Sequence, residues 1–96
     1  MDYEIGIKGS NDDNYVKINC LINQANCFEQ LKRYTEAVDI YGKAIMLNPS
    51  ECYFYLRRGK LKILIDTKMS ACLDLSKSGE LGCEDAYEVI RDFCNN

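Results

Sequence analysis

The sequence predicts an all-α protein in which consecutive helices stack as antiparallel neighbours. Apolar residues recur at three- and four-residue steps over most of the chain, which is the spacing of one buried helix face. Short polar breaks separate these stretches, and the only strand-like segment has no obvious partner strand. Because short links place successive helices side by side, the helices should alternate in direction. The length of 96 residues indicates one domain.

Residues 1–11 differ from the rest of the chain. Tyr3, Ile5 and Ile7 alternate with Gly and charged residues, which is a period-two pattern typical of a strand. Two interpretations stay open: a loosely ordered tail, or an arm that lies in a groove of its own or of a neighbouring molecule. We treat residues 12–94 as the folded domain.

Five helices are expected within that domain. The first pair covers about residues 12–48, and Pro49 ends its second helix because proline disfavours the helical state of the preceding residue. The second pair covers about residues 51–79, and a capping helix covers about 84–94. The expected core positions are Tyr15, Ile18, Leu21, Ile22, Ala25 and Phe28, then Ala37, Ile40, Tyr41, Ala44 and Leu47, and in the last helix Ala86, Val89, Ile90 and Phe93.

The second pair is predicted as helices at about 51–66 and 69–77. Gly79 and Gly82 then act as C-terminal signals. Glu84 and Asp85 stand at the start of the last helix, where the helix dipole favours negative charge. Asp74 and Glu80 have no partner that the sequence reveals.

Composition argues against several classes of protein. With 12 Lys+Arg against 15 Asp+Glu, the chain lacks the basic excess of a nucleic-acid-binding protein. It has no histidine, no glycine-rich phosphate loop and no metal-ligand spacing, so we predict no enzyme, no cofactor and no metal. No apolar stretch approaches the roughly 20 residues of a membrane helix, and the acidic N-terminus lacks a secretory core. We therefore expect a cytoplasmic protein with no membrane partner.

Six cysteines are present, and we expect them to be reduced and to pack as small apolar side chains. Cys20 and Cys27 lie seven residues apart on one predicted helix, so their Cα atoms are roughly 10 Å apart and cannot be bridged. Cys72 and Cys94 are two cysteines that can meet, between the fourth and last helices. A buried thiol pair is the simpler interpretation, and a redox-sensitive latch is the alternative.

An internal repeat of 34 residues runs through the chain. Small residues fall on small ones and large on large when the chain is shifted by this length, and the small residues should let paired helices approach closely. The matched positions are Leu21 with Tyr55, Ala25 with Gly59, Leu31 with Ile65, Ala37 with Ala71, Tyr41 with Leu75, Ala44 with Ser78, and Leu47 with Leu81.

These residues resemble the tetratricopeptide repeat (TPR). The first unit carries its pattern at Leu21, Ala25, Phe28, Ala37, Tyr41, Ala44 and Pro49. The second unit keeps Tyr55, Gly59 and Ala71 but has Arg58, Lys62 and Cys83 where an apolar residue, an aromatic residue and proline are usual. The C-terminal end is also similar to Sel-like repeats. The resemblance covers about residues 18–94 and implies a right-handed superhelical stack of two repeats plus a capping helix.

The resemblance implies a non-catalytic protein–protein interaction module, or scaffold, which binds a peptide or helix of a partner in its concave groove. The implied groove residues are Asn19, Ile22, Asn26, Glu29, Gln30, Tyr53, Leu56, Arg57, Lys60, Ile63 and Leu64.

Two questions about binding stay open at this stage. The five cations at Arg57, Arg58, Lys60, Lys62 and Lys68 form either a solvated helix face or a site for an acidic peptide. The alternative function is a homo-oligomeric assembly module that uses the uncapped N-terminal face or the arm.

Overall fold

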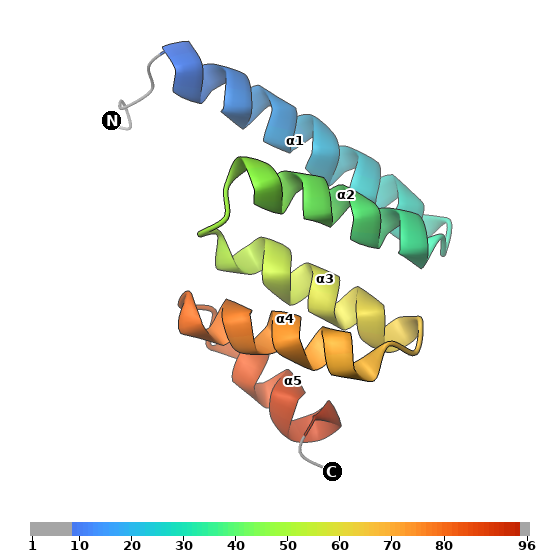
Figure 1. Ribbon diagram of the computed structural model, residues 1–96. Helices are drawn as coiled ribbons and strands as arrows, with labels where there is room; N and C mark the ends of the chain where they lie inside the picture. The colour runs from blue at the N-terminus through green and yellow to red at the C-terminus, as the bar shows by residue number, and fades with distance from the viewer. Residues whose placement is uncertain (1–8, 95–96) are drawn as a thin grey trace.

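The computed structural model describes residues 9–94, and they form five α-helices. The strand-like pattern at Tyr3, Ile5 and Ile7, and most of the predicted arm, lie outside the described residues. The helices, labelled in Figure 1, are α1 (Gly9–Gln30), α2 (Tyr34–Leu47), α3 (Cys52–Leu64), α4 (Lys68–Glu80) and α5 (Asp85–Phe93).

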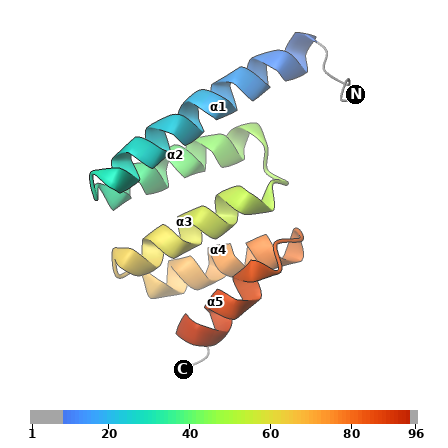
Figure 2. The ribbon, with the colours of Figure 1, turned by 180° about the vertical axis from the view of Figure 1, so that it is seen from behind.

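Each helix packs on the next helix of the chain, so the fold is a one-dimensional stack of antiparallel neighbours (Figure 1). The stack has two layers: α1, α3 and α5 face the viewer in Figure 2, and α2 and α4 lie behind them. Its extents of 46 × 28 × 18 Å are those of a slab. The predicted all-α fold of antiparallel pairs is confirmed.

Some helix ends differ from the sequence-based expectation. Helix α1 begins at Gly9, ahead of the predicted start near residue 12, and α4 continues to Glu80. Gly79 is therefore not a stop signal but a buried residue inside α4, where the Tyr87 ring of α5 lies so close that a Cβ would stand 2.6 Å from its Cζ. The left-handed residue after α4 is Gly82, with φ of 117°, so this glycine alone follows the C-terminal pattern.

The first hydrophobic core lies between α1, α2 and α3. Its centre is formed by small residues and one tyrosine, because Ala25, Ala37, Ala44 and Tyr41 have no exposed surface. The predicted role of small residues is confirmed at all these alanines and at the α3–α4 contact. There a Cβ on Gly59 would stand 2.8 Å from Leu75 Cγ and 3.2 Å from the Ala71 carbonyl oxygen. Only glycine fits at this crossing without movement of α4.

The second core lies between α3, α4 and α5 and is smaller. Leu56, Leu75 and Ala86 are buried in it, and Val89 and Ile90 of α5 pack against them. Phe93, which was also expected in the core, is 46% exposed, so that expectation is wrong. Ser78 has no exposed surface and donates a hydrogen bond of 2.9 Å from its Oγ to the Cys52 carbonyl oxygen, which ties the end of α4 to the start of α3.

Two disulfide bonds hold α5 in place, which corrects the expectation that the cysteines are reduced. Cys52 at the start of α3 is bonded to Cys83 in the α4–α5 link, and Cys72 of α4 is bonded to Cys94 after α5. Their Cα atoms are 5.6 and 6.0 Å apart, within the range of about 4.4–6.8 Å that a disulfide needs. The bonds lie at the two ends of α5, so the capping helix is covalently fixed at both.

Helix α1 is longer than its partner, and its first turns project beyond α2 (Figures 1 and 2). Tyr15 was expected in the core but is 67% exposed, because no other helix among the described residues lies beside this part of α1. The buried face of α1 therefore begins about one turn later, near Ile18.

Candidate functional site

The inner layer of the stack is the candidate binding surface. Helices α1, α3 and α5 lie on the same side of the molecule (Figure 2). The small residues of these helices are buried at their contacts with the other layer: Ala25 of α1 packs in the core with α2, and Gly59 of α3 lies against α4. The groove residues implied by the repeat pattern all come from α1 and α3.

A pocket of about 240 Å³ opens on this layer between α3 and α5. Its walls are Lys60, Ile63 and Leu64 from α3 and Val89 and Phe93 from α5. The first three were predicted as groove residues, and the last two were missed. These two residues were missed because α5 occupies the place of a third inner helix. Its apolar side chains therefore line the groove as well as the core.

The lining of this pocket is apolar except for one cation. Lys60 is partly exposed and forms no ion pair with any of the side chains described, those of residues 14–94. No acidic side chain lines the pocket. An apolar wall with one free ammonium group fits a ligand that combines an apolar side chain with a carboxylate.

Two of the predicted groove residues, Arg57 and Glu29, are bonded to each other within the protein. Arg57 Nη2 of α3 forms an ion pair with Glu29 Oε1 of α1, although the two residues are 28 positions apart. Tyr41 of α2 donates a hydrogen bond of 3.2 Å from its hydroxyl to Glu29 Oε2. This cluster joins α1, α2 and α3, so Arg57 and Glu29 connect the two helix pairs. Within the described residues, the buried Nε of Arg57 has no hydrogen-bond partner.

The remaining predicted groove residues divide by exposure. Asn19, Asn26 and Gln30 are exposed on α1, so they are available to a ligand. Tyr53 is 43% exposed and packs edge-on against Phe54. Leu56 is only 7% exposed because it belongs to the second core. The last of the set, Ile22, is partly buried against the first core.

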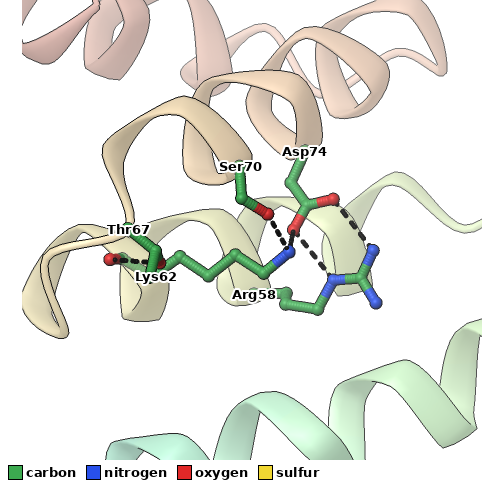
Figure 3. A network of polar contacts seen from close by, with 5 residues as sticks. All are labelled: Arg58, Lys62, Thr67, Ser70 and Asp74. Atoms are coloured by element: carbon green, nitrogen blue, oxygen red, sulfur yellow. Dashed lines mark hydrogen bonds and ion pairs between the residues drawn. The ribbon is translucent and has the colours of Figure 1, made fainter.

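The basic run of α3 is mostly neither a solvated face nor a peptide site. Arg58 donates two hydrogen bonds to Asp74 of α4, from Nε at 2.8 Å and from Nη2 at 2.9 Å. Lys62 Nζ lies 3.0 Å from Asp74 Oδ2 and donates to Ser70 Oγ at 2.7 Å. Figure 3 shows how both cations converge on the one carboxylate. Asp74 thus has two partners, where the sequence revealed none.

This network is shielded from solvent and acts as a polar contact between α3 and α4. The exposed fractions of its side chains are 23% for Arg58, 16% for Lys62 and 8% for Asp74. The hydrogen bond with Asp74 raises the pKa of the Arg58 guanidinium, against the burial that lowers it. Arg58 and Lys62 replace the apolar and aromatic residues of the repeat pattern, so a buried ion-pair network replaces apolar packing here.

Burial raises the pKa of the Tyr41 phenol to about 12, and the nearby Glu29 charge adds to this shift while Arg57 opposes it. The folded value exceeds the unfolded value of 10.0, so the neutral phenol stabilises the fold fully below pH 10. That stabilisation is lost as the pH rises through 12. We expect the phenolate absorbance of wild type minus that of Tyr41→Phe to rise near pH 12. Tyr15→Phe, at an exposed position, is the control; a Tyr41 component that rises near pH 10 would contradict the burial argument.

The chemistry of the described residues gives no sign of a metal centre or a membrane span. Residues 14–94, whose side chains the structure describes, contain no cluster of three potential metal-ligating side chains. None of the five helices combines the length and the apolar character that a bilayer crossing requires.

The fold and its inner surface define the class of protein: a helical repeat protein built from antiparallel helix pairs. Residues 18–51, which include most of α1, all of α2 and the turn after it, match the family model of the tetratricopeptide repeat and form one such repeat. Comparison with curated proteins gives no match, and comparison with solved structures gives none. A TPR domain is generally a protein–protein interaction module and typically non-catalytic.

Proposed function

We propose that the protein binds an extended or helical segment of a partner protein on its inner layer, with the α3–α5 pocket as the anchor point. The observation that carries the proposal is the combination of four apolar side chains with Lys60 in one open pocket. A carboxylate on the ligand pairs with the Lys60 ammonium, and an adjacent apolar side chain enters the pocket.

The size of the pocket favours a peptide over a small molecule. Its volume of 240 Å³ is below the roughly 300–1,000 Å³ of pockets that enclose small ligands. It is one part of a longer surface on which exposed polar side chains of α1, including Asn26 and Gln30, are available for a peptide backbone. A peptide uses such a surface by placing one side chain in the pocket and its backbone along the polar residues.

The test uses synthetic peptides, because the partner is defined only by its chemistry. A fluorescein-labelled ten-residue peptide of alternating Glu and Leu is compared with Lys/Leu and Glu/Ser peptides in fluorescence anisotropy. Only the Glu/Leu peptide should bind well. Lys60→Glu should weaken its binding by about tenfold or more, because it replaces an attraction worth about 1.4 kcal/mol with a repulsion.

Matched variants separate the groove from general charge and hydrophobicity. Lys77→Glu makes the same charge change as Lys60→Glu, but at an exposed site on α4. Phe93→Ser removes an apolar side chain from the pocket, and its control, Leu73→Ser, removes an exposed apolar side chain from α4. Both α4 variants should bind as wild type does. Equal loss in Lys60→Glu and Lys77→Glu would contradict the assignment of the groove, as would equal binding of all three peptides.

Self-assembly is the second candidate function, because one observation favours it independently of the groove. The two free cysteines among the described residues, Cys20 and Cys27, are both exposed on α1. The helix that carries them stands at the open end of the stack (Figure 1).

A further inference from the structure

The outer face of α1 carries a stripe of apolar and sulfur-containing side chains. Val16 is 58% exposed, Leu31 is 64% exposed, and Cys20 and Cys27 are exposed between them. A helix turns about 100° per residue, so these four residues lie on the side of α1 opposite the fully buried Ala25. Leu31 continues the helical register, because its amide donates to the Cys27 carbonyl oxygen at 3.1 Å. We call these four residues the outer stripe.

The two ends of the stack are treated differently. At the C-terminal end, α5 covers the second core and is held there by two disulfides. At the N-terminal end, no described helix lies beyond α1 (Figure 2), and the four residues of the outer stripe are exposed. Repeat proteins normally carry a polar outer face on their terminal helix. An apolar stripe in that place is what an interface requires.

The outer stripe is symmetric along the helix. Val16 and Leu31 lie at equal distances on either side of the midpoint between Asn23 and Gln24, and Cys20 and Cys27 do so as well. When two copies of α1 pair antiparallel about a two-fold axis at that midpoint, each Val16 is level with the other copy's Leu31. Each Cys20 is then level with the other copy's Cys27. A two-fold interface needs this self-complementarity.

Charge and distance are compatible with the pairing. Of residues 14–31, only Lys17 and Glu29 are charged, and Glu29 is paired with Arg57. Lys17 comes level with the uncharged Gln30 of the other copy, so no like charges meet. Helices that pack at 8–10 Å leave about 3.5–5.5 Å between Cα atoms that face each other. This range overlaps the Cα separation of a disulfide.

We propose that the outer stripe is the interface of a two-fold homodimer in which α1 pairs antiparallel with α1 of a second copy. The partner is thus the same chain, and the axis passes between Asn23 and Gln24. Because Cys20 of each copy faces Cys27 of the other, an oxidising thiol buffer locks the dimer. The surface is separate from the groove, which lies on the inner layer.

The covalent step is thiol–disulfide exchange with a low-molecular-weight disulfide such as glutathione disulfide. The Cys20 thiolate attacks one sulfur of that disulfide, forms a mixed disulfide and releases one glutathione thiolate. The Cys27 thiolate of the other copy then attacks the Cys20 sulfur, forms the intermolecular bond and releases the second glutathione thiolate. Each bond therefore oxidises two protein thiols and reduces one glutathione disulfide.

Single-cysteine variants test the register. The full chain is incubated with glutathione disulfide, and dimers are detected by gel electrophoresis without reductant and by mass spectrometry of linked peptides. Wild type should form a dimer joined by Cys20–Cys27 bonds. Cys20→Ser alone and Cys27→Ser alone should stay uncrosslinked, because their remaining cysteines are about 10 Å apart along the paired helices. An equal mixture of the two variants should crosslink again, through one Cys27 and one Cys20.

Each departure from this pattern overturns the proposal. Self-crosslinking of either single variant at the rate of the mixture indicates a parallel or random contact, and a mixture that stays monomeric excludes the antiparallel register. Circular dichroism of each variant verifies folding, and mass spectrometry verifies that the Cys52–Cys83 and Cys72–Cys94 bonds are intact.

A non-covalent measurement uses the Cys20→Ser/Cys27→Ser variant, which has no free thiol among its described residues. Analytical ultracentrifugation should detect a concentration-dependent dimer. Adding Val16→Glu and Leu31→Glu should raise the dimer Kd by about tenfold or more, because four carboxylates then enter one interface. Met46→Glu, at an 83% exposed site on α2, is the matched control and should leave Kd unchanged. A monomer at all concentrations, or an equal effect of Met46→Glu, would refute the interface.

Discussion

Replacing Asp74 with alanine is expected to destabilise the protein by about 3–5 kcal/mol, because it leaves two shielded cations without their counter-charge. Arg58 and Lys62 both contact this carboxylate, and neither has another anionic partner among the described residues. The remaining hydrogen bond from Lys62 to Ser70 does not neutralise charge. Chemical denaturation followed by circular dichroism measures the loss. In a domain whose total stability is about 5–15 kcal/mol, a change of this size is easily resolved.

Two further variants distinguish the loss of the ion-pair network from the effect of removing any carboxylate side chain. Asp39→Ala removes an exposed carboxylate from α2 and should change stability by less than about 0.5 kcal/mol. Arg58→Met combined with Asp74→Leu and Lys62→Met removes all the charges together and should recover much of the lost stability. If Asp74→Ala lowered the free energy of unfolding by less than about 1 kcal/mol, the ion-pair network would not stabilise the α3–α4 contact.

Removal of the disulfides is the second large effect. The bonds close loops of 31 and 22 residues, and each should contribute about 3–4 kcal/mol by restricting the unfolded chain. We expect the Cys72→Ala/Cys94→Ala variant to lower the denaturation midpoint and to weaken groove binding. The second effect follows because α5, with nine residues, is too short to be stable alone and supplies Val89 and Phe93 to the pocket.

The control for this experiment is Cys20→Ala/Cys27→Ala, which changes two exposed cysteines and should leave stability within about 0.5 kcal/mol of wild type. Binding of the Glu/Leu peptide is measured in parallel. Unchanged stability in the Cys72→Ala/Cys94→Ala variant would show that the bond does not hold α5. Lower stability with full peptide binding would show that α5 does not complete the pocket.

The disulfides also bear on where the protein resides. The cytoplasmic location inferred from the sequence stays a prediction. Disulfides persist in oxidising compartments, whereas cytosolic thiols are kept reduced. Alkylation of the protein in intact cells, followed by mass spectrometry, tests whether the two bonds at α5 are present where the protein resides.

The fold was predictable because its signals are local and repeated. The three- and four-residue spacing of apolar side chains defines the helices, and the 34-residue spacing of Ala25 with Gly59 and of Ala37 with Ala71 defines the pairs. These small residues are buried at the helix contacts, as the repeat pattern requires. The exposure of Tyr15 was not predictable in the same way, because it depends on the length difference between α1 and α2.

The polar and covalent contacts were harder to predict because they join residues that are distant in the sequence. Arg58 and Lys62 are one turn apart on α3, and their departure from the repeat pattern is the signal for a shared anion. Choosing Asp74 as that anion requires the position of α4. The sequence indicated that Cys72 and Cys94 can meet but favoured a reduced pair, and the bond between Cys52 and Cys83 depends on the path of the α4–α5 link.

The candidate site was predicted in part. Lys60, Ile63 and Leu64 line the pocket, whereas Arg57 and Glu29 are tied to each other and Leu56 is buried. The repeat pattern indicates which helix face is inward, but it does not indicate which inward side chains are buried or paired with another residue of the same protein. Phe93 was predicted in the core because all apolar residues of the last helix were expected to cover the second helix pair.

Binding of a partner segment in the pocket between α3 and α5 can be mapped residue by residue. The most direct measurement is a two-dimensional nitrogen–proton NMR titration of the full chain with the Glu/Leu peptide. Binding in the pocket should give concentration-dependent shifts at the amides around Lys60, Ile63, Leu64, Val89 and Phe93. Shifts confined to α2 or to the outer stripe of α1, or no shifts at peptide concentrations up to about 1 mM, where even a binding energy of about −4 kcal/mol is detected, would contradict it.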